Sequence, residues 1–152
     1  MFFALALHVL SVTIWVGGMF FAYMALRPVA ASLLEPPMRL SLWREVFARF
    51  FPWVWAAVIL LLGSGYWIIF AVYGGMAGSP LHIHIMSGLG LLMMAIFLHV
   101  FFAPYRRLIR AVNETRWPEG AKALNQIRQL IGLNLLLGLL TITVATAGKY
   151  LF

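Results

Sequence analysis

The chain has 152 residues, of which 64% are hydrophobic and only 10% are charged, and its formal net charge is +7. This composition excludes a soluble globular domain and is typical of a membrane protein. Because the chain has no cysteine and only four carboxylates, histidine and methionine are the main side chains left to perform chemistry. No nucleophile arrangement, phosphate-binding glycine loop or carboxylate pair stands out, which sets aside a hydrolase or a kinase.

Four stretches are apolar and long enough to cross about 30 Å of hydrocarbon as helices. They cover residues 2–26, 51–73, 81–103 and 124–147. We therefore predict an all-α fold, a polytopic membrane protein in which residues 1–152 form one domain, an up-down-up-down bundle of four transmembrane helices. The first stretch ends at Arg27-Pro28 and not at a small-residue cleavage site, which favours a retained helix over a signal peptide.

The three connections differ in character. From Met38 to Phe50 apolar and basic positions recur at helical spacing, which predicts either a helix in the membrane interface or an extension of the second span. The glycines and the proline within 74–80 predict a tight turn. In the third connection we expect Trp117-Pro118 to end one short helix and Glu119-Gly120 to open the next.

Positive charge is concentrated in two of the connections. The second connection carries no charge, and Lys149 is the only basic residue near the C-terminus. The positive-inside rule therefore predicts that the first and third connections are cytoplasmic and that both termini lie outside. The same balance indicates contact with anionic lipid in the bilayer and gives no support for nucleic-acid binding. The basic residues concerned are Arg27, Arg39, Arg44, Arg49, Arg106, Arg107, Arg110, Arg116 and Lys122.

Histidines within the spans are the candidate functional residues. His8, His84 and His99 lie inside apolar runs, and His82 stands at the start of one. An imidazole in hydrocarbon is costly unless it is paired, hydrogen-bonded or bound to a metal. The first and third spans run in the same direction and lie diagonally in a simple bundle, so His8, His82 and His84 share a depth near the outer face.

Helical spacing places thioethers below two of these histidines. His82 shares a helix face with Met86 and Met93, and His8 aligns with Met19. Imidazole and thioether without a carboxylate suit cuprous copper better than a hard cation. Methionine is also a common gap-filler in cores, so the deeper methionines have a packing interpretation that stays open. The candidate copper ligands are His8, His82, His84, Met86, Met19 and Met93.

A b-type haem is the alternative cofactor. Two histidines at one depth on diagonal helices, His8 and His84, could be axial ligands of haem iron. Trp15, Gly18 and Gly88 would then border the ring, and His99 could serve a second, inner haem. Haem propionates prefer cationic partners, and the outer end offers only Lys149, which favours copper there. A structural subunit with hydrogen-bonded histidines is the third interpretation.

Six motifs occur in order along the chain: His8-x6-Trp15-x-Gly17-Gly18 with Arg27-Pro28, Arg49-Phe-Phe-x-Trp, Gly65-Tyr-Trp, Leu81-His-x-His-x-Met86, Phe102-x-Pro104-Tyr-Arg-Arg, and Ile127-Arg with Asn134. Together they resemble those of the copper-resistance protein D (CopD) family of bacterial inner-membrane proteins. This resemblance implies copper binding, transport or tolerance in the bacterial inner membrane, alongside a periplasmic copper-binding partner or a redox partner. Glycines within the spans also permit close packing, so a homodimer stays open.

The pattern around His8, Trp15 and Gly18 is also similar to the first helix of HemJ-type protoporphyrinogen oxidases. The architecture is similar to that of four-helix b-type cytochromes as well. These resemblances imply that His8 is an axial haem ligand in a protein of electron transfer or porphyrinogen oxidation. The sequence thus leaves copper handling as the first hypothesis and a haem b protein as the second.

Overall fold

The computed structural model describes residues 1–151 and shows only helices and short connections in that part of the chain. Four continuous helical stretches are long and apolar enough to cross a membrane, so the predicted all-α architecture with four spans is confirmed. The elements in order are α1 (Phe2–Phe21), η1 (Ala22–Leu26), α2 (Arg27–Leu33), α3 (Pro36–Tyr73), η2 (Met76–Gly78), α4 (Leu81–Phe102), α5 (Pro104–Asn113) and α6 (Trp117–Leu151).

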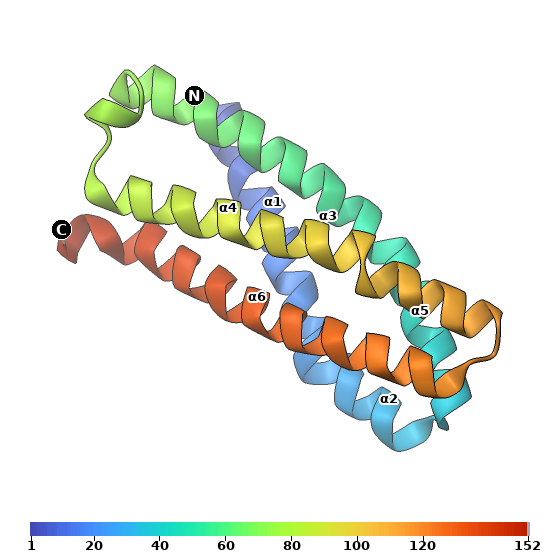
Figure 1. Ribbon diagram of the computed structural model, residues 1–152. Coiled ribbons are helices and arrows are strands. Elements are labelled where there is room, and N and C mark those ends of the chain that lie inside the picture. Colours follow the sequence, from blue (N-terminus) through green and yellow to red (C-terminus); the bar gives the residue numbers. More distant parts are fainter. Residues whose placement is uncertain (152) are drawn as a thin grey trace.

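Successive long helices run antiparallel along one bundle (Figure 1). Helix α1 packs mainly against α3, and α6 packs against both α4 and α5. The α3–α4 connection and the C-terminus lie at the same end of the bundle, whereas α2, the start of α3 and the α5–α6 connection lie at the other end. We call these the outer end and the basic end. Which end faces outward stays a prediction from the charge distribution.

Two of the helices, α3 and α6, are longer than the apolar stretches alone predict. Helix α3 runs without a break from Pro36 through Pro52 to Tyr73, so the segment after Met38 extends the second span. Trp117 and Pro118 open α6 and do not end a short helix. Proline is tolerated in the first helical turn because its missing N–H would have no partner there.

The turn between α3 and α4 depends on two glycines. Gly74 ends α3 with a φ of 69°, and Gly75 follows with a φ of 120°. Both angles lie in the left-handed region, which residues with a Cβ atom rarely adopt. These two residues reverse the chain at the outer end and so place the first turn of α4, with its two histidines, at that end.

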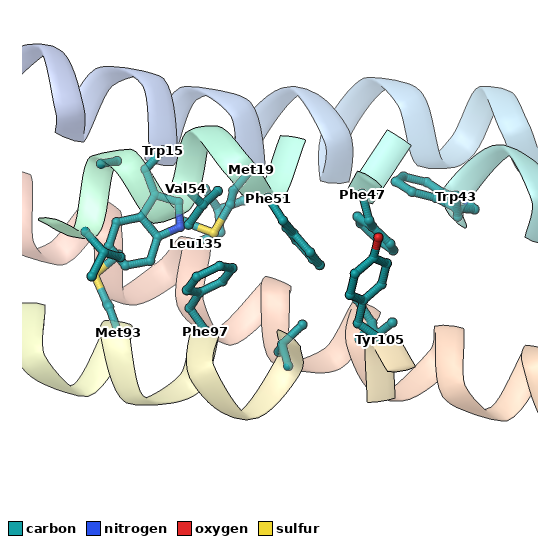
Figure 2. Packing of buried hydrophobic residues seen from close by; sticks show 14 of the residues in the cluster. Trp15, Met19, Trp43, Phe47, Phe51, Val54, Met93, Phe97, Tyr105 and Leu135 are labelled. Carbon is teal, nitrogen blue, oxygen red and sulfur yellow. The ribbon is translucent and has the colours of Figure 1, made fainter. Parts of the chain in front are cut away.

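Aromatic side chains fill the interior between the helices (Figure 2). Phe51 lies at the centre of this cluster, stacked on Phe47 with ring centroids 5.0 Å apart. The rings of Phe97 and Tyr105 meet Phe51 edge-on at 5.5 and 4.8 Å. Each such pair contributes about 0.5–1.5 kcal/mol beyond the area it buries. Many large apolar side chains remain exposed on the outside of the bundle, as expected for helices that face lipid.

Helices α1, α4 and α6 meet closely at one point, and this contact shows which of their residues lie at the same depth in the bundle. Gly138 of α6 is buried, and a Cβ atom at this position would lie 2.9 Å from Val16 Cγ2 on α1 and 3.2 Å from Met93 Cε on α4. The three residues therefore lie at one level. Small residues allow membrane helices to approach this closely.

Candidate functional site

His8 projects from α1 towards α3, where it meets a serine between two glycines. Its Nδ1 atom lies 3.0 Å from the hydroxyl oxygen of Ser64. The Ser64 hydroxyl itself donates to the carbonyl oxygen of Leu60 at 2.5 Å. A hydroxyl has one hydrogen, so the Ser64 oxygen accepts from His8 and Nδ1 carries the proton. The lone pair of His8 consequently resides on Nε2, the nitrogen that can bind a metal.

Gly65 gives the ring of His8 its space on α3. A Cβ atom at Gly65 would lie 3.2 Å from His8 Cε1, which is tighter than ordinary contact. Ser64 and Gly65 thus form the part of α3 that positions the imidazole. Sequence reasoning did not identify Ser64. The signal for it was the run Gly63-Ser64-Gly65 inside an otherwise apolar span.

His82 lies in the first turn of α4 and packs against α6. A Cβ atom at the buried Gly148 would lie only 2.7 Å from the Cβ atom of His82, so the two helices touch here. The Nδ1 atom of His82 is buried and has no hydrogen-bond partner among the described residues. Buried polar atoms are nearly always paired, so this ring nitrogen is available to a partner that the described residues do not supply.

His84 and His99 lie on the surface of the bundle. Both are exposed, and the Nδ1 atom of His84 donates to the carbonyl oxygen of Pro80, one turn earlier, at 3.2 Å. Gly88, between the two histidines, has no atom within 4 Å of an added Cβ. This face of α4 therefore turns away from the interior, towards lipid or another molecule.

The deeper methionines are part of the packed core. Met19 and Met93 are only 2% and 3% exposed, and Figure 2 shows both in the interior beside Trp15. The Thr141 hydroxyl donates to the carbonyl oxygen of Leu137 at 2.7 Å, and its oxygen lies 3.8 Å from the sulfur of Met93. Met86, nearer the outer end, is half-buried and does not belong to the buried core.

The residues expected to border a haem ring differ in their surroundings. Trp15 is 2% exposed and meets Phe97 edge-on, with ring centroids 6.2 Å apart. Gly18 lies directly beneath the ring of Phe50, which an added Cβ would strike. Aromatic side chains therefore occupy the space next to Trp15 and Gly18, whereas Gly88 lies open on the surface.

The helical register places the outer histidines at similar depths. His8 lies about two turns outward of Val16 along α1, and Met86 lies about two turns outward of Met93 along α4. Because Val16 and Met93 share a level at Gly138, His8 and Met86 share one to within about a turn. His82 lies one further turn outward on the same face as Met86.

The four histidines do not form one preassembled cluster. Among residues 1–151 no point brings together three or more histidine, aspartate or glutamate side chains that could hold a metal ion. His8 turns towards α3, His82 towards α6, and His84 towards the surface. The outer end therefore offers two half-buried imidazoles and one thioether, on two diagonal helices, and has no carboxylate near it in the sequence.

The fold and these side chains define a multi-pass helical membrane protein with soft donor atoms at one end. The family model of copper resistance protein D matches residues 44–147, more than half of the chain. The chain therefore belongs to the copper resistance protein D family and is, in general terms, a copper-resistance membrane protein. Comparisons with curated proteins and with solved structures give no match.

Proposed function

We propose that this protein captures cuprous copper at the outer end of its bundle, with copper as cargo. His82 and Met86 supply the first donors. His8, at a similar depth on α1 but turned towards α3, supplies its Nε2 atom as a separate donor to which copper passes next. His84, in the same turn of α4, is positioned to pass copper from the surface. Family membership supports the proposal, as does the buried Nδ1 atom of His82, which has no hydrogen-bond partner within residues 1–151.

The chemistry of the outer end suits a soft cation. His82 and Met86 lie one turn apart on one face of α4, so a nitrogen and a thioether sulfur approach the same volume. The carboxylates Glu35, Glu45, Glu114 and Glu119 all belong to the basic connections. Hard cations such as Mg²⁺ and Ca²⁺ require oxygen ligands, whereas imidazole and thioether favour copper.

His8 is prepared for ligation by the hydrogen bond it makes. Its Nδ1–H donates to Ser64, which fixes the ring and leaves Nε2 unprotonated. Metal-binding histidines characteristically donate their second ring nitrogen in this way, and loss of that bond costs about 10–100-fold in affinity. Inward of the site, Met19 and Met93 are candidates for a route through the core. Delivery by a periplasmic copper-binding partner is part of the same proposal.

A haem held between His8 and His84 receives less support. Axial ligation requires both imidazoles to face one common space, but His84 is exposed and bonded to Pro80 while His8 turns towards α3. The residues as arranged do not fit a ring between these two side chains. The haem hypothesis stays a prediction, and its test is described in the Discussion.

The proposal is tested by titrating the detergent-purified full chain with Cu(I) against a chromogenic chelator under reducing conditions. We expect one tight site per chain and a loss of at least about tenfold in affinity for His82→Gln and for Met86→Leu. Leucine is close to methionine in volume, so M86L should fold normally. His99→Gln at the basic end and Met94→Leu in the core are matched controls, and we expect both to bind like the wild type.

A further variant tests the position of His82 without removing its imidazole. Gly148→Ala would press a Cβ atom against His82 and displace the first turn of α4 without removing a donor atom. We expect G148A to weaken Cu(I) binding while the helix content stays unchanged by circular dichroism. Wild-type affinity in both H82Q and M86L, or an equal loss in both controls, would overturn the proposal.

A further inference from the structure

A cavity of about 230 Å³ lies at the basic end, far from the outer histidines. Its walls come from η1, α2, the first turns of α3 and the first half of α6. Three of the lining side chains are arginines, and no lining residue is a carboxylate. The aromatic rings of Tyr23, Trp43 and Phe47 form much of the remaining wall. The arginines are Arg27, Arg39 and Arg128.

Arg39 is held in place but keeps unused hydrogen-bonding capacity. Its Nη2 atom donates to the carbonyl oxygens of Leu34 at 3.0 Å and of Ala31 at 3.3 Å, which ties the guanidinium to the end of α2. Its Nε atom is buried and has no partner within the described part of the chain. A buried, unpaired N–H of a cation is costly, so a ligand that accepts this hydrogen bond would be favoured.

Arg27 and Arg128 add two charges that no carboxylate neutralises. The guanidinium of Arg27 lies over the ring of Tyr23, 4.3 Å from its centroid, and Arg128 donates to Asn125. The ion pairs found within residues 1–151 involve only Arg44 and Arg116. Their partners are Glu45, Glu114 and Glu119, while the fourth carboxylate, Glu35, is exposed and does not line the cavity.

We propose that this cavity binds a phosphate group, presented by the headgroup of an anionic phospholipid. Guanidinium groups match phosphate oxygens with paired hydrogen bonds, and three of them surround one space. The cavity lies where the apolar spans give way to basic connections, the level at which headgroups reside. Its volume is below the roughly 300–1,000 Å³ of pockets that enclose drug-sized ligands, which suits a headgroup.

The test measures lipid binding to the detergent-purified full chain by native mass spectrometry and by thermal shift. The probes are phosphatidylglycerol, phosphatidylcholine and inorganic phosphate. We expect phosphatidylglycerol to bind in preference to phosphatidylcholine, and Arg128→Gln and Arg27→Gln each to weaken that binding about fivefold. Arg128 bonds only within its own helix, so R128Q tests the site even if Arg39→Gln, which removes the contacts to α2, fails to fold.

Arg110→Gln is the matched control, because Arg110 is exposed at the same end of the bundle but does not line the cavity. It should change phosphatidylglycerol binding less than twofold. Stabilisation by inorganic phosphate alone, lost in R128Q, would assign the site to free phosphate and not to a lipid. Equal losses in R110Q and R128Q, or no preference for either phosphate-bearing anion, would overturn the proposal.

Discussion

The imidazole of His8 on α1 donates a hydrogen bond to the hydroxyl of Ser64 on α3, with 3.0 Å between the two atoms. Both residues lie inside membrane spans, and the bond joins two helices that otherwise meet through apolar side chains. It fixes the rotation of the ring and the position of its proton. The bond thus gives His8 a role in the packing of α1 on α3 and leaves its Nε2 atom without a proton.

Removal of the Ser64 hydroxyl should therefore destabilise the bundle. We expect Ser64→Ala to lower the free energy of unfolding by about 0.6 kcal/mol, the average value of interhelical hydrogen bonds in membranes, and by no more than about 1.7 kcal/mol. The measurement is unfolding by SDS titration in mixed micelles, followed by circular dichroism.

Ser11→Ala provides the control for this bond. Ser11 is also buried, on α1, but its hydroxyl donates only to Leu7 of its own helix. We expect S11A to remain close to the wild type. If both variants lost the same free energy, the interhelical bond of His8 would contribute nothing measurable.

The sequence predicted which residues share a helix face but not which way each face turns in the bundle. Periodicity places His82 and Met86 on one face of α4, and the structure keeps them so. It cannot tell whether a face meets a neighbouring helix or lipid, because every face of these spans is apolar. For this reason the exposed position of His84 and the hydrogen bond between His8 and Ser64 emerged only from the packing of the helices.

The lengths of the helices were likewise predicted only in part. Hydropathy detects the part of α3 that crosses the hydrocarbon but not its continuation to Pro36, where arginines alternate with apolar residues. Those apolar positions, Leu40, Trp43 and Phe47, are buried in the core at the basic end. The extension is helical because it packs over that end of the bundle. This packing involves residues distant in the sequence, so local composition predicts it only weakly.

Two adjacent glycines on α1 should respond in opposite ways to the same substitution. Gly18→Ala would drive a Cβ atom into the ring of Phe50, whereas Gly17→Ala meets no atom within 4 Å. Overpacking costs about 1–3 kcal/mol, so G18A should be destabilised. G17A should be neutral or gain up to about 1 kcal/mol, because alanine favours a helix over glycine. Unfolding in SDS measures both, and equal destabilisation would contradict the packing of α1 on α3.

An absorption spectrum separates the copper hypothesis from the haem alternative. The full chain would be expressed with haem and copper supplied and then purified in detergent. Because His8 and His84 do not face a common space, we expect no Soret band and no α-band after dithionite reduction, together with copper by elemental analysis. A reduced α-band with stoichiometric iron would reject this expectation, and its loss in His8→Gln would identify an axial ligand.

The orientation of the bundle decides which compartment the outer histidines meet. The chain has no cysteine, so single cysteines at exposed sites report sidedness against a clean background. Ala77 in η2 marks the outer end, and Thr115 between α5 and α6 marks the basic end; both are exposed. We expect a membrane-impermeant maleimide to label Ala77→Cys in intact cells and Thr115→Cys only after the membrane is opened.

The reverse labelling pattern would mean that the bundle has the opposite orientation in the membrane, with His82 and Met86 on the cytoplasmic side. Copper capture from outside would then be wrong, although the donor set itself would be unchanged. Labelling of both cysteines in intact cells would indicate mixed orientation, in which case the charge asymmetry between the connections would be too weak to fix the topology. Because neither substitution removes a charge, the labelling tests the orientation that the native arginines impose.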